Sequence, residues 1–264
     1  MGIMGGFDND VVSFFQPDTV ISCDLSSWIT LEYKAAANLA RRLDRSSEQA
    51  GYAEAAAALR DRIEHVLWCD EVSSYAAYNL CTGLHQFSFA EEGLDESVGK
   101  YTYQTCSNLI PLYARIASPD RAKTMIERYV LSEDHFLSPF GIRSLSRSSE
   151  FYNNAIWGNP PRFGYHGRPT NSNWQGPVWI PLCYFMFHAL RYYGYAREAE
   201  DLANRTLRVL ARSIEKRGSF FENYHAETGQ PLYAKGFVSW NVLADVMHSE
   251  LRENRWIMDC VFGS

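Results

Sequence analysis

The stretch GPVWIPLCYFMFHALRYYGYAREAEDLANRTLRVLARSI, residues 176–214, places two helical patterns of opposite character next to each other. Residues 176–193 are apolar on nearly every face, which is typical of a helix that is buried on all sides. Residues 196–214 carry one apolar stripe with helical spacing, at Leu202, Leu207, Leu210 and Ile214. The pair therefore predicts a buried inner helix followed by an outer helix with one face toward solvent.

The same alternation of buried and amphipathic helices runs along the rest of the chain. We expect inner helices at residues 24–43, 107–117, 176–193 and 235–251, and outer helices at residues 45–68, 119–131 and 196–214. Apart from one short strand expected at residues 73–80 and a long loop at residues 135–170, no other element stands out. Two concentric helical layers indicate an all-α fold, the (α/α)6 barrel, which is a toroid of helix hairpins.

The number of helices indicates that this barrel is incomplete. We expect about seven long helices in the 264 residues, whereas a closed ring of six hairpins needs twelve. Residues 1–264 are therefore interpreted as a single barrel domain that corresponds to the C-terminal part of the toroid. An incomplete ring leaves an apolar edge, which we expect self-association or a missing N-terminal barrel segment to cover.

Composition and charge exclude several partners. The formal net charge is -6 and no run of Lys or Arg is present, so we expect neither nucleic acid nor anionic lipid to bind. The longest apolar run, Val178–Leu190, is too short to span a membrane. The six cysteines form no C-x-x-C pair and the first residues do not form a signal peptide, which favours a cytoplasmic location. Because the histidines form no metal motif, we expect no metal and no other cofactor.

Three unusual stretches each come shortly before an expected inner helix. They are GGFDNDVVSF at residues 5–14, NSNWQGPVW at residues 171–179 and SFFENYHAETGQP at residues 219–231. In a two-layer toroid all inner helices run in the same direction, so the loops that precede them gather at one end of the ring. Sequence order alone therefore predicts that the three stretches share a common mouth.

Two acids among aromatic rings at one mouth suit the hydrolysis of a glycosidic bond. One carboxylic acid protonates the leaving oxygen, while the other carboxylate activates water or attacks directly. Aromatic rings also remove water from a neighbouring carboxyl group, which raises its pKa. Several of these residues have a plain structural interpretation as well: Asp8 can cap a turn, Asp24 or Ser26 can cap the start of a helix, and the tryptophans can be core residues.

Four segments resemble motifs of glycoside hydrolase family 63. NSNWQGPVW resembles its N-W-R-G-P-I-W segment, and FFENYHAETGQP with the following GFVSWNVL resembles F-x-E-N-Y-x-P-x-T-G…G-W-S. CDLSSWITLEYKAAANLARRL looks like the helix V-D-L-N-A-x-L-x-x-E-x-x-A-L-A, and LSPFGIRSLS resembles T-P-Y-G-L-x-S-L-S. The resemblance runs from about residue 4 to residue 247, and the inverting trehalases share part of it. It implies an (α/α)6 barrel and an α-glucosidase-like enzyme that cleaves an α-glucosidic or α-mannosidic bond with inversion.

The resemblance also implies roles for individual residues. Glu222 occupies the place of the general base. MGGFDND resembles the acid-bearing segment E-S-G-M-D-N-S-P, which makes Asp8 the general acid and leaves Asp10 as the alternative. A small carbohydrate or glycoside substrate is then expected to contact Asp24, Trp174, Gln175, Gly176, Trp179, Tyr224 and Trp240.

The sequence departs from the family pattern in three places, which leaves other functions open. Met4 stands for the leading Glu of the acid segment, Asp10–Val11 stands for its Ser-Pro, and Gln175 stands for an Arg. A non-catalytic carbohydrate-binding or interaction fragment is therefore the main alternative. A sugar epimerase or isomerase of related fold would call for two histidines at the mouth, where only His166 and His225 qualify.

Overall fold

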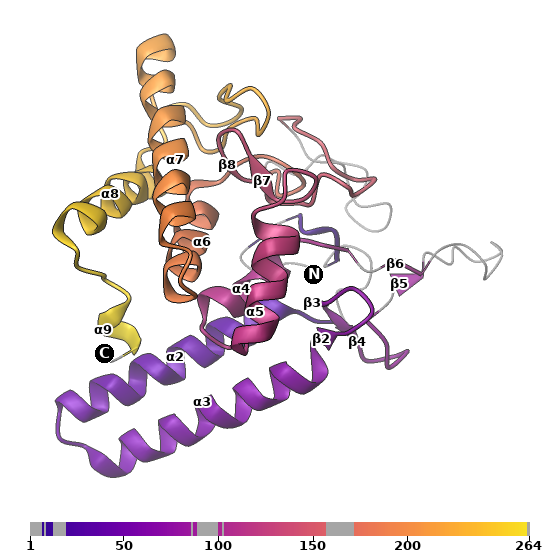
Figure 1. The fold of residues 1–264 in the computed structure, drawn as a ribbon, viewed down its shortest axis with the longest axis vertical. Helices are drawn as coiled ribbons and strands as arrows, with labels where there is room; N and C mark the ends of the chain where they lie inside the picture. The colour runs from indigo at the N-terminus through magenta and orange to yellow at the C-terminus, as the bar shows by residue number, and fades with distance from the viewer. Residues whose placement is uncertain are drawn as a thin grey trace.

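The structure, a computed structural model, describes residues 7, 9–12, 20–85, 87–88, 100–101, 103–156 and 172–262. Helices dominate this part of the chain (Figure 1). They are α2 (Cys23–Arg42), α3 (Ser46–Val66), α4 (Ile110–Tyr113), α5 (Pro119–Met125), α6 (Ile180–Tyr192), α7 (Ala196–Arg217), α8 (Leu243–Glu253) and α9 (Asp259–Phe262). Three further helical turns are η1 (Cys106–Leu109), η2 (Ile126–Val130) and η3 (Ser239–Val242).

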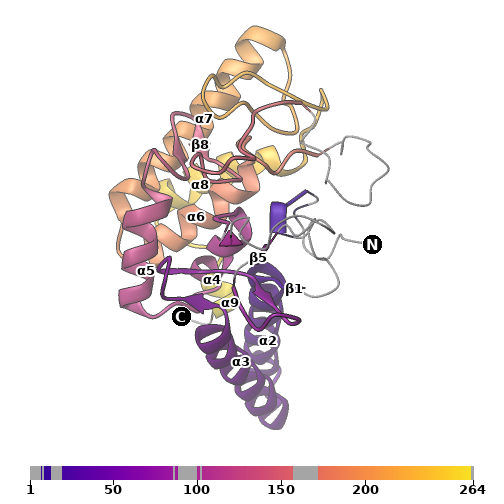
Figure 2. The same cartoon turned by 90° about the vertical axis from the view of Figure 1, so that its right-hand side faces the viewer.

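The helices pack in the order that the alternating pattern predicts. Outer helix α3 packs along α2, and outer helix α7 packs along α6. Among the expected inner helices, α4 contacts both α2 and α6, and α6 in turn contacts α8. The inner helices α2, α4, α6 and α8 therefore follow one another as neighbours, as in a sector of a two-layer ring. In both views the α2–α3 hairpin forms one end of the molecule and α7 lies toward the other (Figures 1 and 2).

The strands are short and occur in pairs. β1 (Val20–Ile21) pairs with β4 (Tyr78–Asn79), β2 (Trp68–Cys69) with β3 (Ser74–Tyr75), β5 (Phe87–Ser88) with β6 (Lys100–Tyr101), and β7 (Leu137–Ser138) with β8 (Gly141–Ile142), all antiparallel. The single strand expected at residues 73–80 is thus two strands with different partners. The loop expected at residues 135–170 contains the β7–β8 hairpin, and its last part lies outside the described residues.

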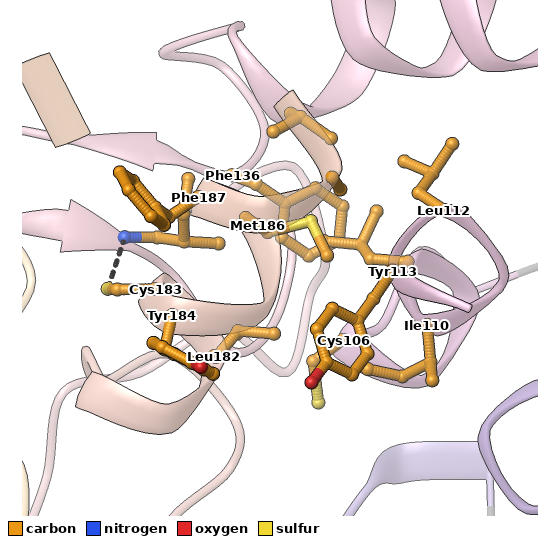
Figure 3. Packing of buried hydrophobic residues seen from close by; sticks show 14 of the residues in the cluster. Cys106, Ile110, Leu112, Tyr113, Phe136, Leu182, Cys183, Tyr184, Met186 and Phe187 are labelled. Atoms are coloured by element: carbon orange, nitrogen blue, oxygen red, sulfur yellow. Dashed lines mark hydrogen bonds between the residues drawn. The ribbon is translucent and has the colours of Figure 1, made fainter. Parts of the chain in front are cut away.

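Helix α6 is the centre of the core. Met186, Phe187 and Leu182 are fully buried, and residues of η1, α4 and the β7–β8 region surround them (Figure 3). The dashed line that ends on Cys183 in Figure 3 is a hydrogen bond of 3.3 Å from the Ile142 backbone N–H to its sulfur, which joins β8 to α6. A helix with apolar residues on all faces contributes stability only when it is enclosed, which explains its inner position.

One face of α2 has no partner among the described residues. Leu25, Ile29, Leu39 and Leu43 recur at helical spacing and are 40%, 41%, 58% and 57% exposed. Four exposed aliphatic side chains on one face of a helix are unusual for a free surface. They confirm the apolar edge that the sequence predicts for an incomplete ring, while the identity of the segment that covers it stays a prediction.

The inner helix expected at residues 107–117 is shorter than predicted. A 3-10 turn, η1, leads into the four residues of α4, which ends at Tyr113, and Arg115, two residues later, has a φ of 52°. The apolar pattern of this stretch is satisfied by complete burial, since Leu109, Ile110 and Leu112 are fully buried. Apolar periodicity therefore located the buried segment correctly but overestimated its helical length.

The central position of α6 gives a first prediction. Replacing Phe187 with Ala should lower the free energy of unfolding by about 3–5 kcal/mol, because the lost ring leaves a cavity in an enclosed core. Tyr52 on α3 is 37% exposed, and its replacement by Ala is a matched aromatic control with an expected loss of about 0.5 kcal/mol or less. Urea unfolding measures both values, and similar losses for the two variants would contradict the enclosed position of α6.

Candidate active site

Backbone hydrogen bonds join three loops in front of α6. The N–H of Val178 donates to the carbonyl of Tyr224 at 2.8 Å, and the N–H of Tyr224 donates back to Val178 at 3.0 Å. Val178 also forms an antiparallel bridge with Arg143, and Tyr224 forms one with Pro231. The stretches around residues 143, 178 and 224 are therefore fixed side by side by their main chains.

The described part of the N-terminal stretch joins the same group of loops. Asn9 accepts a hydrogen bond from the Trp174 N–H through Oδ1 and one from Gln175 Nε2 through its carbonyl, the latter at 3.2 Å. The ring of Phe7 lies 4.8 Å from that of Trp174. The three stretches that sequence order assigns to one mouth thus contact each other in pairs, the first with the second and the second with the third.

Glu222 lies on a main chain that is held from both sides. Its N–H donates to the carbonyl of Tyr233 at 2.9 Å, and its carbonyl accepts a hydrogen bond of 3.0 Å from Trp240 Nε1. The neighbouring carbonyl of Phe221 accepts a hydrogen bond of 2.7 Å from Asn241 Nδ2. The side chain of Glu222 is only partly buried. One of its carboxylate oxygens, Oε2, is buried. A carboxyl group on a fixed main chain in a partly buried position is suited to act on a bound molecule.

Three tryptophans form a row beside Glu222. Trp174 and Trp179 stack at 4.0 Å with an angle of 8° between their rings, and Trp179 lies 5.6 Å from Trp240. Trp179 is fully buried, and its Nε1 donates to the carbonyl of Asn173 at 2.8 Å. Trp240 is partly exposed, so it is the member of the row that can offer a ring face to a sugar.

Other residues of the two motifs support the loops from inside. Gln175 is 3% exposed, and its Oε1 accepts a hydrogen bond of 3.2 Å from Asn153 Nδ2. A Cβ atom on Gly176 would lie 2.0 Å from the carbonyl oxygen of Asn153, so only glycine fits there. The hydroxyl of the fully buried Tyr224 accepts a hydrogen bond of 3.0 Å from the N–H of Phe221. Direct contacts of these residues with a substrate stay predictions.

The two candidates for the general acid differ in what the structure says of them. Asp8 lies outside the described residues. Asp10 is 3% exposed, and its two oxygens accept hydrogen bonds from the Val12 N–H at 3.1 Å and from Thr105 Oγ1 at 2.9 Å. Burial, together with the charge of Asp24, raises the pKa of Asp10 to about 7, although its hydrogen bonds oppose the shift. A carboxyl group enclosed in this way is poorly placed to protonate a substrate, which favours Asp8.

Asp24 does not cap its own helix. Helix α2 begins after Ser22, which makes no capping hydrogen bond with its side chain. The carboxyl group of Asp24, 2% exposed, accepts a hydrogen bond of 2.8 Å from Ser107 Oγ. The interpretation of Asp24 as a helix cap is therefore wrong, because its side chain is directed to η1 instead. Its contact with a substrate stays a prediction.

Sequence reasoning missed an ion pair near the Glu222 loop, between the buried Arg143 and the partly exposed Glu227. Arg143, 1% exposed, donates to both oxygens of Glu227 through Nε at 2.8 Å and Nη2 at 3.1 Å. Its Nη1 donates to the carbonyls of Glu133 and His135, and Tyr152 donates to Glu227 at 2.6 Å. A single Arg within the apolar GIRSL segment is the signal that could have revealed it. This pair joins the loop after β8 to the loop of the candidate base.

The described part of the chain contains neither a metal site nor a membrane span. Among these residues no group of His, Cys, Asp and Glu is arranged to hold a metal ion. No helix there is long and apolar enough to cross a membrane. All six cysteines fall within the described ranges and are free thiols.

The Arg143–Glu227 pair gives a second prediction. Glu227→Gln should lower the free energy of unfolding at neutral pH by about 1–3 kcal/mol, because the buried guanidinium loses a charged partner. Burial raises the pKa of Glu227. The hydrogen bonds and charge of Arg143 and the hydrogen bond of Tyr152 together lower it by more, so its pKa is below the usual value. This stabilisation is therefore present above the usual pKa and is lost as the pH falls through the depressed value.

Denaturant unfolding of the variant and the parent protein at neutral and at acidic pH checks this prediction. The difference should disappear well below about pH 4. The exposed Glu150, replaced by Gln, serves as the control and should change little at either pH. A difference that grows in acid would contradict the direction of the pKa shift.

Comparisons with known proteins identify the family. The sequence matches the model of the mannosylglycerate hydrolase MGH1-like glycoside hydrolase domain over residues 6–240. It is 27% identical to a mannosylglycerate hydrolase of Rubrobacter radiotolerans over 213 residues, which are 80% of this chain and 40% of that protein. It is 24% identical over 246 residues to a probable mannosyl-oligosaccharide glucosidase of Schizosaccharomyces pombe, covering 86% of this chain and 26% of that protein. The chain thus spans less than half the length of these relatives.

Solved structures support the fold. The family 63 mannosylglycerate hydrolase from Thermus thermophilus, in complex with glucose, aligns with a TM-score of 0.62 and 21% identity over 87% of this chain and 48% of that chain. A neutral trehalase from Saccharomyces cerevisiae aligns with a TM-score of 0.60 and 17% identity over 88% and 38% of the two chains. Both are (α/α)6 barrels, so the predicted fold class, an incomplete barrel of this kind, is confirmed. The chain belongs to the MGH1-like mannosylglycerate hydrolase domain family of the glycoside hydrolases, within glycoside hydrolase family 63.

Proposed function

We propose that this chain is the acid- and base-bearing part of an inverting glycoside hydrolase that cleaves an α-glucosidic or α-mannosidic bond. The observation that carries the proposal is the position of Glu222. It lies within the matched family segment, on a main chain held from both sides, next to the partly exposed ring of Trp240. The same segment includes Asp8, so both proposed catalytic residues belong to this part of the barrel.

The proposed reaction is a single displacement. Glu222 accepts a proton from a water molecule while the water oxygen forms a bond to the anomeric carbon. The bond from that carbon to the leaving oxygen breaks, and Asp8 gives its proton to this oxygen. Inversion requires the two carboxyl groups to be roughly 6.5–9.5 Å apart, so that the water fits between Glu222 and the sugar.

The surroundings of Glu222 suit a general base because its geometry is fixed before the substrate binds. Hydrogen bonds hold the main chain at Glu222 and at its neighbour Phe221. Trp240 contributes one of these bonds through its indole nitrogen and is also held against Phe237, whose ring lies 4.3 Å away. A base and a stacking ring that share one support do not have to be ordered when the sugar arrives.

A second candidate function is carbohydrate binding without catalysis. The observation in its favour is that the chain spans 40% of the Rubrobacter mannosylglycerate hydrolase that it matches. The open apolar face of α2 also shows that one edge of the described ring sector has no partner among the described residues. In this case the fragment would bind a sugar at the mouth but release no product.

Replacement of Glu222 by Gln distinguishes the two functions. The variant should lose about 10²–10⁴-fold in kcat on aryl α-glucoside or α-mannoside and on mannosylglycerate, because the amide cannot accept the proton of water. Calorimetry should show that sugar binding is retained. The exposed Glu200 on the outer helix α7, replaced by Gln, should hydrolyse normally. Normal hydrolysis by Glu222→Gln would rule out this base, and binding without hydrolysis by the parent chain would favour the second function.

The stereochemistry of the first product tests inversion. An α-glycoside that is hydrolysed by a single displacement should release the β anomer first, before mutarotation mixes the anomers. Proton NMR within the first minutes of the reaction measures the ratio of anomers. Initial release of the α anomer would indicate a covalent intermediate and would contradict the single displacement.

A further inference from the structure

A cleft of about 390 Å³ lies between helices α2 and α3. Its lining includes Lys34 and Arg41, which are about two turns apart in the second half of α2 and so lie on one face of the helix. Asp24, at the start of the same helix, is an expected substrate contact, and Lys34 lies about 15 Å farther along the helix axis. Helix α9 packs beside α2, and its Phe262 also lines the cleft (Figure 1). The cleft is therefore separate from the candidate active site.

Small side chains make the room for this cleft. Four alanines line it, Ala37 on α2 and Ala53, Ala56 and Ala57 on α3. Because none of these side chains extends beyond Cβ, they leave a space between the two helices that longer side chains would fill. Gln49 adds a side-chain amide, which can bond to a hydroxyl group. The cleft therefore offers an apolar surface and a polar group to the organic part of a small molecule.

All charged side chains that line the cleft are positive. They are Lys34 and Arg41 from α2 and Arg60 from α3. Burial, followed by the positive charges of Arg60 and Arg115, lowers the pKa of Lys34 to about 8. The cations thus lie close enough to repel one another, and a negatively charged ligand between them would relieve this repulsion.

The two cations of α2 form no ion pair among the described residues. Lys34 Nζ donates to the backbone carbonyls of Ala114 at 2.7 Å and Arg115 at 3.3 Å. Arg41 Nη2 donates to Asn38 Oδ1 at 2.9 Å. All three acceptors are neutral, and both cations keep further N–H groups that can donate to a ligand.

The other two cations have acidic partners. Arg60 Nη2 lies 3.2 Å from Asp61 Oδ1, and Arg115 Nη2 lies 3.5 Å from Asp259 Oδ1. Neither acid lines the cleft. Two of the four positive charges are therefore balanced by a neighbouring carboxylate, and the two on α2 are not. This excess matches the charge of a dianion.

We propose that the cleft binds a small organic phosphate, a phosphate monoester whose phosphate group is held by Lys34 and Arg41 and whose organic part packs against the alanines. Ammonium and guanidinium groups donate strong, charge-assisted hydrogen bonds to phosphate oxygens. The net charge of -6 repels a large polyanion, whereas a small ligand meets only the local positive charges. This inference does not depend on the proposed function, because the cleft and the candidate base lie apart.

Isothermal titration calorimetry at low ionic strength tests the proposal, with a hexose 6-phosphate and inorganic phosphate as probes. The parent chain should bind the hexose phosphate saturably, with a Kd on the order of 1 mM or tighter. Arg41→Gln and Lys34→Met should each weaken binding about tenfold or more, because each removes a charged donor. The exposed Arg62 on α3 does not line the cleft, so Arg62→Gln is the matched control and should bind as the parent chain does.

A variant that keeps every charge tests the apolar surface. Ala57→Leu fills part of the cleft, so it should weaken the hexose phosphate more than inorganic phosphate. Melting temperatures at matched ionic strength provide a second measurement. The hexose phosphate should raise the melting temperature of the parent chain by mass action, and it should raise that of Arg41→Gln less. Arg41 is exposed, so this variant decides the question if Lys34→Met does not fold.

Three results would overturn the inference. They are the absence of saturable binding by the parent chain, equal affinity of the parent chain and Arg41→Gln, and loss of binding in Glu222→Gln, which would place the ligand at the candidate active site. Equal weakening of both probes by Ala57→Leu would contradict the contact between the organic part and the alanines. If the parent chain hydrolyses no glycoside, the proposed function fails, whereas each of these binding measurements keeps its meaning.

Discussion

The pair of hydrogen bonds between the main chains of Val178 and Tyr224 is the constraint on which the site depends. Both side chains are fully buried, so the two loops meet in a place where unpaired backbone groups would be costly. Val178 comes two residues before α6, and Tyr224 comes two residues after Glu222. The bonds thus fix the candidate base relative to helix α6, most of whose residues are buried. Core packing and the position of the carboxylate are consequences of the same contact.

The family motifs encode a support more than a binding surface. Within NSNWQGPVW, the residues that attract attention as sugar ligands are buried: Gln175 binds Asn9 and Asn153, and Trp179 lies beneath Trp174. Gly176 is required because the carbonyl of Asn153 passes too close for a side chain. In the second motif, by contrast, several residues are only partly buried or exposed, with Glu222 and Trp240 among the partly buried ones. A small reactive surface held by many buried contacts is what preorganised catalysis requires.

Much of the fold could be predicted from the sequence because its long helices are strongly periodic. The observed bounds of α2, α3 and α7 lie within a few residues of the expected ones. The sequence predicts one helix over residues 107–117, since a buried segment and a buried helix give the same apolar pattern. Nothing in the sequence signals the positive φ of Arg115 that follows the short helix. The arrangement of the three loops followed from helix direction alone. Arg143 was missed because one charged residue in a loop has no period, and its partner Glu227 lies 84 residues away.

Helix α2 has an open apolar face and also carries the buried Asp24, which lies near the buried Asp10. Both features need an explanation, because each is unfavourable for this segment taken alone. Leu25, next to Asp24, is 40% exposed, whereas Asp24 itself is 2% exposed. An apolar side chain in water and a carboxyl group in the core each cost free energy, so neither is retained for the stability of this segment alone. The exposed face is accounted for if further helices complete the barrel. The two buried carboxyl groups connect neighbouring segments: Asp24 accepts a hydrogen bond from Ser107 of η1, and Asp10 is joined through Phe7 to the tryptophan motif. Helix α2 then contributes to the barrel with one face and holds the buried Asp24 against η1 with the other.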